Sequence, residues 1–224
     1  MRKTKHRTAA RLWAAVLLLL IGCLLPPRLP HGRMEVPGYV EKILGETLVG
    51  ETDQARIKYV YTACGLTEQV GYFWGGKSHA LGWDTAWGRP RRVVAPGSST
   101  TGHIRPYGLD CSGFVSWAAA TAWEDAAAYN EVGEGVRAQY ALCTPVVFPR
   151  SGDLAFFADL SHVGIVLGRD KEGTLWVAHC SASMGGVVVT PASVGFSLYG
   201  CPALFSMGTR RKKYIPVYYR SDAR

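Results

Sequence analysis

The sequence predicts an α+β fold in which N-terminal helices pack on a central antiparallel β-sheet, and two observations lead to this expectation. Apolar residues recur at helical spacing after Asp53 and again from Cys111. From Asp153 onward, strand-like segments follow one another with short connections. Short connections suit antiparallel neighbours, because parallel strands need long crossovers.

The first 33 residues indicate a targeting segment. They hold seven Lys or Arg, no Asp or Glu, and an apolar run from Leu12 to Leu25 that two prolines end. The run is shorter than the roughly 20 residues of a membrane-spanning helix, which favours a secretory signal peptide. The letters LIGC, ending at Cys23, resemble the lipobox of bacterial lipoproteins and predict lipidation there. An uncleaved membrane anchor is the alternative; both place the domain outside the cytoplasmic membrane, secreted or tethered to its outer face.

The net charge of +8 is concentrated in residues 1–33, because their seven cations leave only +1 for the rest of the chain. A near-neutral domain has no electrostatic field suited to a phosphate backbone, so we do not expect nucleic acid as a partner. The basic run from Arg210 to Lys213 falls in a C-terminal segment, 207–224, and predicts a solvated patch.

Between these ends we expect a linker over 34–52, with one short helical region, and a single domain over 53–206. Apolar residues make up 48% of the chain, which is enough for a hydrophobic core. The domain starts with a helix that Asp53 begins and Gly65 ends.

The stretch from Gly71 to Gly108 is rich in Gly and Trp and lacks periodicity, so it predicts a long loop, most of it at 77–108. Loops of this length in a compact domain are usually functional or mobile. Its first letters, up to Ser78, also match the P-loop pattern G-x-x-x-x-G-K-[ST] of nucleotidases. We disfavour this alternative because a P-loop follows a buried strand, whereas a helical pattern precedes this segment and three aromatics fill its variable positions.

The letters LDCSG join a polar turn to an apolar helix. Asp110 suits the N-cap of that helix, and Gly113 removes side-chain bulk beside the sulfur of Cys111. A helix N-terminus lowers the pKa of a thiol through unpaired N–H groups and the helix dipole, so this position predicts a reactive cysteine. A small buried core residue is the alternative. The apolar face of the helix comprises Cys111, Phe114, Val115, Ala118, Ala119 and Ala122.

The strands after this helix bring two histidines together. A four-residue turn at 170–173 would place Arg169 opposite Thr174, and in that register His162 and His179 share one face of the sheet. A turn of odd length without a bulge would separate them. We expect the helix of the cysteine to cover this histidine face. The predicted strands are 153–158, 162–169, 174–181 and 186–190, with a further candidate at 214–219.

A nucleophile, a base and an orienting group together activate a thiol, and Cys111, His162 and His179 suit these three roles. Zinc bound by the same side chains is an alternative, but it would block the nucleophile. No C-x-x-C pair occurs, which disfavours a structural zinc site, and we expect no metal or other cofactor. Four further cysteines would suffice for two disulfides in an exported protein, with the pairing left open: Cys64, Cys143, Cys180 and Cys201.

Five motifs follow in order: YFWGG (72–76), LDCSGFV (109–115), GDLAFF (152–157), SHVGIVLG (161–168) and AHCSAS (178–183). Together they resemble the NlpC family of bacterial cell-wall cysteine peptidases. The resemblance implies a papain-like fold and hydrolysis of peptidoglycan stem peptides, between γ-D-glutamate and a diamino acid. It implies Cys111 as nucleophile, His162 as general base and His179 as the third polar residue. It also implies a substrate site lined by Tyr72, Asp110 and Ser112, with the Cys111 N–H as an oxyanion donor.

Two features depart from the family's pattern. The stretch between Tyr72 and Cys111 is longer, so we expect a reshaped substrate groove. No accessory wall-binding domain accompanies the motifs, which favours intact wall over recycled fragments as substrate. An amidase or acyltransferase with the same three residues and a non-catalytic wall-binding module are the alternatives. The expected partners of this monomer are peptidoglycan stem peptides and, through the N-terminal segment, the membrane.

Overall fold

The computed structural model describes residues 34–206. Residues 1–33, with the predicted signal or anchor and Cys23, lie outside the described residues, as do residues 207–224 with the basic run and the strand predicted at 214–219. Within the described part, no helix has the length and apolar character needed to cross a bilayer.

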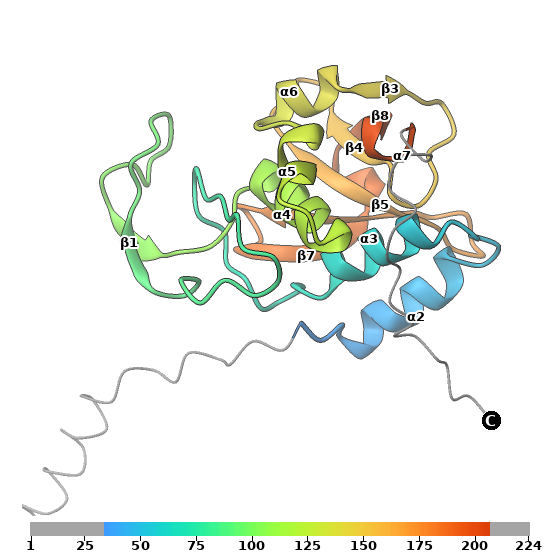
Figure 1. Cartoon of the computed structure of the whole chain (residues 1–224), viewed down its shortest axis with the longest axis horizontal. Coiled ribbons are helices and arrows are strands. Elements are labelled where there is room, and N and C mark those ends of the chain that lie inside the picture. The colour runs from blue at the N-terminus through green and yellow to red at the C-terminus, as the bar shows by residue number, and fades with distance from the viewer. Residues whose placement is uncertain (1–33, 207–224) are drawn as a thin grey trace, which may run out of the picture. The chain divides into compact units, whose positions relative to one another are not determined.

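Apart from two short strands in the long loop, a 3-10 turn and a last short helix, helices come first along the described chain and strands follow (Figure 1). The helices are α2 (Gly38–Thr47), α3 (Gln54–Cys64), α4 (Cys111–Trp123), α5 (Ala127–Val132), α6 (Val136–Ala141) and α7 (Ala203–Ser206), with a 3-10 turn η1 (Ala192–Val194). The strands are β1 (Pro90–Arg92), β2 (Ile104–Pro106), β3 (Cys143–Pro145), β4 (Leu154–Phe157), β5 (Val163–Arg169), β6 (Leu175–Ser181), β7 (Gly186–Pro191) and β8 (Phe196–Pro202).

Six strands form one antiparallel sheet in the order β3-β8-β4-β5-β6-β7. The α+β class is confirmed, and β4 to β7 are the four strands that the sequence predicts. The sequence does not predict β3 and β8, because a three-residue strand and a strand that carries Gly and Pro show little alternation. The long loop contains a second, two-stranded sheet of β1 and β2, and Figure 1 shows β1 standing to the side of the helices and the main sheet.

The main core lies between the sheet and the N-terminal helices. Phe114 and Val115 of α4 are fully buried in the same apolar cluster as Val163 and Ile165 of β5. Because side chains alternate along a strand, these β5 residues point to the face opposite His162.

The histidine face carries a smaller cluster that includes Val166, Val177 and Phe196. The ring of Phe196 lies 5.6 Å from His162 and 5.2 Å from His179, centroid to centroid, and η1 packs beside β6 and β8. The expectation that the cysteine helix covers the histidine face is therefore wrong. Helix α4 buries its long apolar surface against the broader apolar face, and only its N-terminus reaches the start of β5.

The hairpin of β5 and β6 has a different turn from the predicted one, yet the same register at the histidines. Arg169 pairs with Leu175, one residue beyond Thr174, and a bulge at Leu167 then shifts the register so that Ile165 pairs with Ala178. The longer turn alone would put the two histidines on opposite faces. The bulge restores the register, and both side chains share a face as predicted.

The bulge depends on a glycine. Gly168 has φ +127°, and a Cβ there would lie 2.5 Å from the carbonyl oxygen of Thr47 at the end of α2. A side chain at this position would therefore be strained by its own backbone and would also clash with α2.

Helix α2 occupies most of the segment predicted as a linker. Val40 and Leu44 are fully buried in the main core, and the helix packs on β5. Ile43 and Leu48 pack on the same core, so the apolar residues of this segment recur at helical spacing. A helix of ten residues is marginal alone, and burial against β5 stabilises it.

All five cysteines of the described residues are free. Cys64 and Cys180 are fully buried, and Cys180 Sγ donates to the Leu109 carbonyl oxygen at 3.1 Å. The two disulfides that the cysteine count allows are therefore not formed in this structure.

Candidate active site

The thiol of Cys111 lies in the first turn of α4. Asp110 is the N-cap, as predicted, and its Oδ1 accepts a hydrogen bond from the Gly113 amide at 2.6 Å. The cysteine is only 7% exposed. The helix therefore fixes the sulfur at a buried N-terminus, where amide groups of the first turn lack intrahelical partners.

Glycine is needed at position 113 because a neighbouring backbone segment packs against it, more than to leave space beside the Cys111 sulfur. A Cβ at this position would lie 2.2 Å from the carbonyl oxygen of Gly76 and 3.0 Å from Lys77 Cδ. The missing side chain lets the YFWGG segment pack on the first turn of α4. This contact brings Lys77 to the neighbours of the nucleophile.

The ammonium group of Lys77 bridges the two residues that flank Cys111. Its Nζ donates to Asp110 Oδ1 at 2.6 Å, to Asp110 Oδ2 at 2.8 Å and to Ser112 Oγ at 2.7 Å. The P-loop alternative is wrong, because the chain after Lys77 is irregular where a P-loop continues into a helix. The carbonyl of Lys77 instead accepts a hydrogen bond from the Tyr107 hydroxyl.

Burial dominates the electrostatics of the thiol. Desolvation and the Asp110 charge raise the pKa of Cys111 to about 11, while the Val163 amide, the Lys77 charge and the Ser112 amide act in the opposite direction. The expectation of an acidified thiol in the free protein is therefore wrong, because the cost of burying a thiolate exceeds the help from the helix terminus.

The sulfur meets β5 at the amide of Val163, the residue directly after His162. Among the described residues, no hydrogen bond joins Cys111 Sγ to either imidazole. The Cys111 sulfur therefore lies next to the peptide bond that joins His162 to Val163. The predicted nucleophile and the predicted base come near each other at the start of β5.

The two histidines contact each other directly. His162 Nε2 lies 2.8 Å from His179 Nδ1, and their ring centroids are 5.0 Å apart at an interplanar angle of 82°. Phe157 packs on the outer side of His162 with a centroid distance of 4.9 Å. The pairing that the strand register predicts is thus present as a hydrogen bond.

Thr190 of β7 extends this pair. Its Oγ1 lies 3.0 Å from His179 Nε2, so both ring nitrogens of His179 have a partner. Burial lowers the pKa of His162 to about 4. Burial, together with the charge of His162, lowers the pKa of His179 to about 3. Both imidazoles are therefore neutral near pH 7.

Tyr72 is half-buried beside the nucleophile. Its backbone bridges to Leu109, and burial followed by the charges of Cys111 and Asp110 raises the pKa of its phenol. Ser112 is buried and donates to Asp110. Tyr72, Asp110 and Ser112, the three predicted substrate-lining residues, therefore all lie at the first turn of α4.

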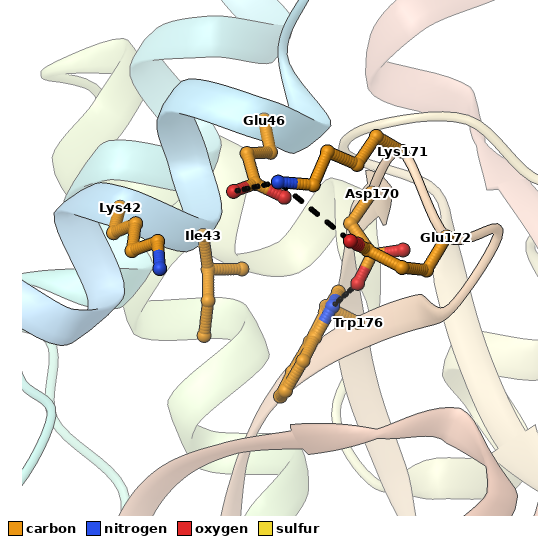
Figure 2. Close-up of a pocket in the computed structure, with 7 residues that line it drawn as sticks. All are labelled: Lys42, Ile43, Glu46, Asp170, Lys171, Glu172 and Trp176. Carbon is orange, nitrogen blue, oxygen red and sulfur yellow. Dashed lines mark hydrogen bonds and ion pairs between the residues drawn. The ribbon is translucent and has the colours of Figure 1, made fainter.

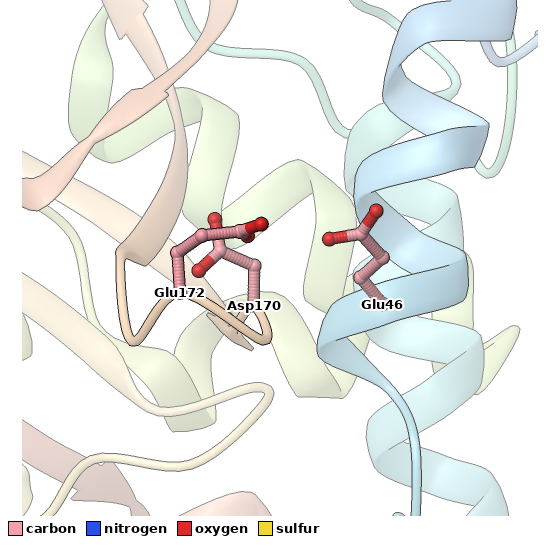
Figure 3. Close-up of side chains that lie close together, drawn as sticks. All are labelled: Glu46, Asp170 and Glu172. Carbon is pink, nitrogen blue, oxygen red and sulfur yellow. The ribbon is translucent and has the colours of Figure 1, made fainter.

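A separate acidic cluster lies at the other end of β5. Oxygen atoms of Glu46, Asp170 and Glu172 all lie within 4.8 Å of one another, and Figure 3 shows the three carboxylates facing each other. Lys171 pairs with Glu46 and Glu172 at 3.6 Å each, and Asp170 accepts from Trp176 Nε1 at 2.7 Å (Figure 2). These internal partners make it an ion-pair cluster that fixes α2 to the hairpin turn, about 20 Å along β5 from the histidines.

A thiol at the first turn of a helix that packs on an antiparallel sheet with paired histidines defines a papain-like hydrolase fold. The profile of the NlpC/P60 family matches residues 69–191, which include Cys111, His162 and His179. The chain belongs to the NlpC/P60 family, which consists in general of cysteine peptidases and amidases that are typically associated with the cell wall and act on peptidoglycan. A comparison with curated proteins found no match to this chain.

The sequence does not predict the roles of two residues of the site, Lys77 and Thr190. Lys77 stands out in the sequence only as part of a P-loop pattern, and its ion pair with Asp110 depends on a loop packing that no periodicity reveals. Thr190 is detectable in principle: it pairs with Val177, two residues before His179, so alternation puts the three side chains on one face.

Proposed function

We propose that this chain is an exported cysteine endopeptidase that cleaves peptidoglycan stem peptides between γ-D-glutamate and a diamino acid. The observation that carries the proposal is the 2.8 Å contact between His162 Nε2 and His179 Nδ1, next to the strand residue whose amide faces the Cys111 sulfur. A catalytic imidazole needs a partner that fixes its tautomer and ring orientation, and His179 has the geometry to supply both.

In this mechanism His162 takes the thiol proton on Nδ1, because its Nε2 is engaged with His179. In the tautomers that this mechanism requires, His162 donates through Nε2–H to His179 Nδ1, and His179 donates through Nε2–H to the Thr190 hydroxyl. This ordered chain of donors leaves Nδ1 of His162 unprotonated. His162 is therefore the general base, and His179 is a positioning residue.

The raised pKa of Cys111, about 11, and the lowered pKa of His162, about 4, describe a resting pair of neutral groups. The sulfur loses its proton to His162 as it attacks the scissile carbonyl carbon, so His162 acts as a base during the step and not as half of a preformed ion pair. The protonated His162 then gives its proton to the leaving amine, and water hydrolyses the resulting thioester.

The amide of Cys111 is suited to stabilise the oxyanion of this step. It belongs to the first turn of α4, whose N–H groups have no partners within the helix. A donor fixed beside the nucleophile stabilises the charge that develops on the carbonyl oxygen.

The protein acts on intact wall as a monomer outside the cytoplasmic membrane in this proposal. Residues 1–33 direct its export and tether it, through a lipidated Cys23 or an uncleaved anchor. Tyr72, Asp110 and Ser112 contact the stem peptide next to the scissile bond.

Mass spectrometry of purified peptidoglycan digested with the protein tests the proposal. We expect fragments that end at γ-D-glutamate from the unmodified protein and none from Cys111→Ala, which folds with an unchanged circular dichroism spectrum. Cys143→Ala, a half-buried cysteine on β3, is the matched control and retains activity. Hydrolysis by Cys111→Ala, or release of whole stems from the glycan as an amidase would produce, contradicts the proposal.

A further inference from the structure

A cationic cavity lies between the long loop and the neighbours of the nucleophile. Its volume is about 200 Å³, and its lining includes Trp74 and Lys77 from the YFWGG segment and Arg91, Arg92 and Tyr107 from the loop. The loop is fixed against this segment, because Trp74 Nε1 donates to the carbonyl oxygen of Pro96 at 2.8 Å. The reshaped stretch between Tyr72 and Cys111 thus builds a cavity of its own.

The arginines of this cavity lack acidic partners. Arg91 and Arg92 are exposed, none of the described lining residues is acidic, and no ion pair within the described part of the chain engages either guanidinium. Arg91 also stands directly opposite Arg105 in the register of β1 and β2. Like charges in directly opposed positions destabilise a strand pair, so this arrangement favours an external anion.

The guanidinium groups are positioned for recognition. Arg91 stacks on the ring of buried Tyr107, with its Cζ 4.3 Å from the ring centroid. Arg92 donates through Nη1 to the Gly102 carbonyl, which leaves its other donors available. An arginine fixed in this way loses less side-chain entropy when it binds a planar anion.

Lys77 joins the cavity to the nucleophile. The side chain lines the cavity, and its ammonium is already paired with Asp110 and hydrogen-bonded to Ser112, the two residues on either side of Cys111. The Asp110 carboxylate therefore does not neutralise the arginines. The positive charges of Arg91 and Arg92 therefore remain available in the cavity. The Lys77 side chain connects this cavity to the two residues that flank the thiol.

We propose that this cavity binds a carboxylate of the stem peptide and so selects the substrate. The inference rests on the proposed function. A γ-linked glutamate keeps its α-carboxyl group free, and the C-terminal residue of the stem carries another. Arginine recognises carboxylates through paired, charge-assisted hydrogen bonds, and Trp74 and Tyr107 supply apolar surface beside the two guanidinium groups.

Calorimetric titration with synthetic stem peptides tests this assignment. Three γ-linked peptides are compared: one with all carboxyl groups free, one with a carboxamide at the glutamyl α-position and one with a C-terminal carboxamide. The protein carries Cys111→Ala, so that binding is measured without cleavage. We expect one carboxamide to weaken binding by about 10- to 100-fold and thereby to identify the recognised group.

Charge-removing variants complete the test. In the Cys111→Ala background, Arg91→Gln and Arg92→Gln each weaken binding of the fully charged peptide by about 10- to 100-fold. Each variant then binds this peptide no more tightly than the carboxamide peptide that the unsubstituted cavity binds less well. Arg137→Gln, which removes an exposed charge on α6, changes binding by less than about twofold. Equal binding of all three peptides, no binding of the fully charged one, or unchanged binding by both cavity variants overturns the inference. A failure of the proposed function is distinguishable, because it appears as a missing or different cleavage with the unmodified cysteine.

Discussion

His162 and His179 face each other across neighbouring strands, with 2.8 Å between Nε2 of the first and Nδ1 of the second. Because each neutral imidazole has one N–H donor and one acceptor nitrogen, this contact couples their tautomers. The 3.0 Å contact between His179 Nε2 and Thr190 Oγ1 extends this coupling to a hydroxyl group, whose oxygen can accept a hydrogen bond from the imidazole N–H. In the proposed arrangement the Thr190 hydroxyl accepts from His179 Nε2–H, which supports the tautomer in which Nδ1 of His162 is unprotonated.

Thr190→Val removes this acceptor with little change of shape. We expect kcat to fall by about tenfold with KM nearly unchanged, because the variant loses tautomer control but no substrate contact. Thr190→Ser, which keeps the hydroxyl, restores most of the rate, and Thr144→Val on exposed β3 has no effect. Equal rates for the Ser and Val variants would show that the hydroxyl does not act through His179.

Stability should fall with acid between pH 6.5 and about 3. The folded-state pKa values of His162 and His179 are lowered from 6.5 to about 4 and about 3, so the unfolded chain binds more protons in this range. Stability is therefore complete above pH 6.5 and is lost as pH falls, by about 1–3 kcal/mol per histidine. Urea unfolding at a series of pH values measures the slope. The double variant His162→Gln, His179→Asn should have a shallower slope, and identical slopes would contradict the account.

Lys77 should control the reactivity of the thiol. In Lys77→Met the Asp110 carboxylate remains beside Cys111 without its cation, so the pKa of the thiol rises further above its ordinary value. We expect iodoacetamide to alkylate Cys111 several-fold more slowly at pH 8, measured by intact-protein mass spectrometry. Lys58→Met removes a lysine that pairs with Glu124 on the surface and leaves the rate unchanged. The same alkylation rate in both variants would exclude this role.

Gly168 should be needed for the histidine pair as well as for stability. Gly168→Ala places a Cβ 2.5 Å from the Thr47 carbonyl oxygen at φ +127°, and we expect a loss of about 2–4 kcal/mol together with lower activity. Gly173→Ala is the matched control, because its φ is +85° but no atom lies within 4 Å of the added Cβ. We expect about 1 kcal/mol there and normal activity at a temperature where both proteins are folded. Equal losses would show that the bulge does not depend on contact with α2.

The strands and helix that carry the site could be predicted because their patterns are strong and local. The apolar face from Cys111 to Ala122 defines α4, and alternation in β5 and β6 places His162 and His179 on one face. The register at the histidines is correct although the predicted turn is one residue too short. The bulge at Leu167 compensates, and only packing of Gly168 on Thr47 reveals it.

What could not be predicted depends on contacts between distant segments. The covering of the histidine face is one example, because alternation tells which residues share a face but not which helix packs on it. The pKa of Cys111 is another, because helix position favours the thiolate while burial disfavours it, and only the packed structure gives the balance. The cavity at Arg91 and Arg92 belongs to a loop without periodicity, where sequence patterns carry no spatial information.

Alkylation with iodoacetamide, followed by peptide mapping and a peptidoglycan digestion assay, tests the central claim most directly. The account predicts that hydrolysis disappears in proportion to the label found on Cys111, with the buried Cys64 and Cys180 unlabelled in the folded protein. Undiminished hydrolysis by protein that is fully labelled at Cys111 would contradict it.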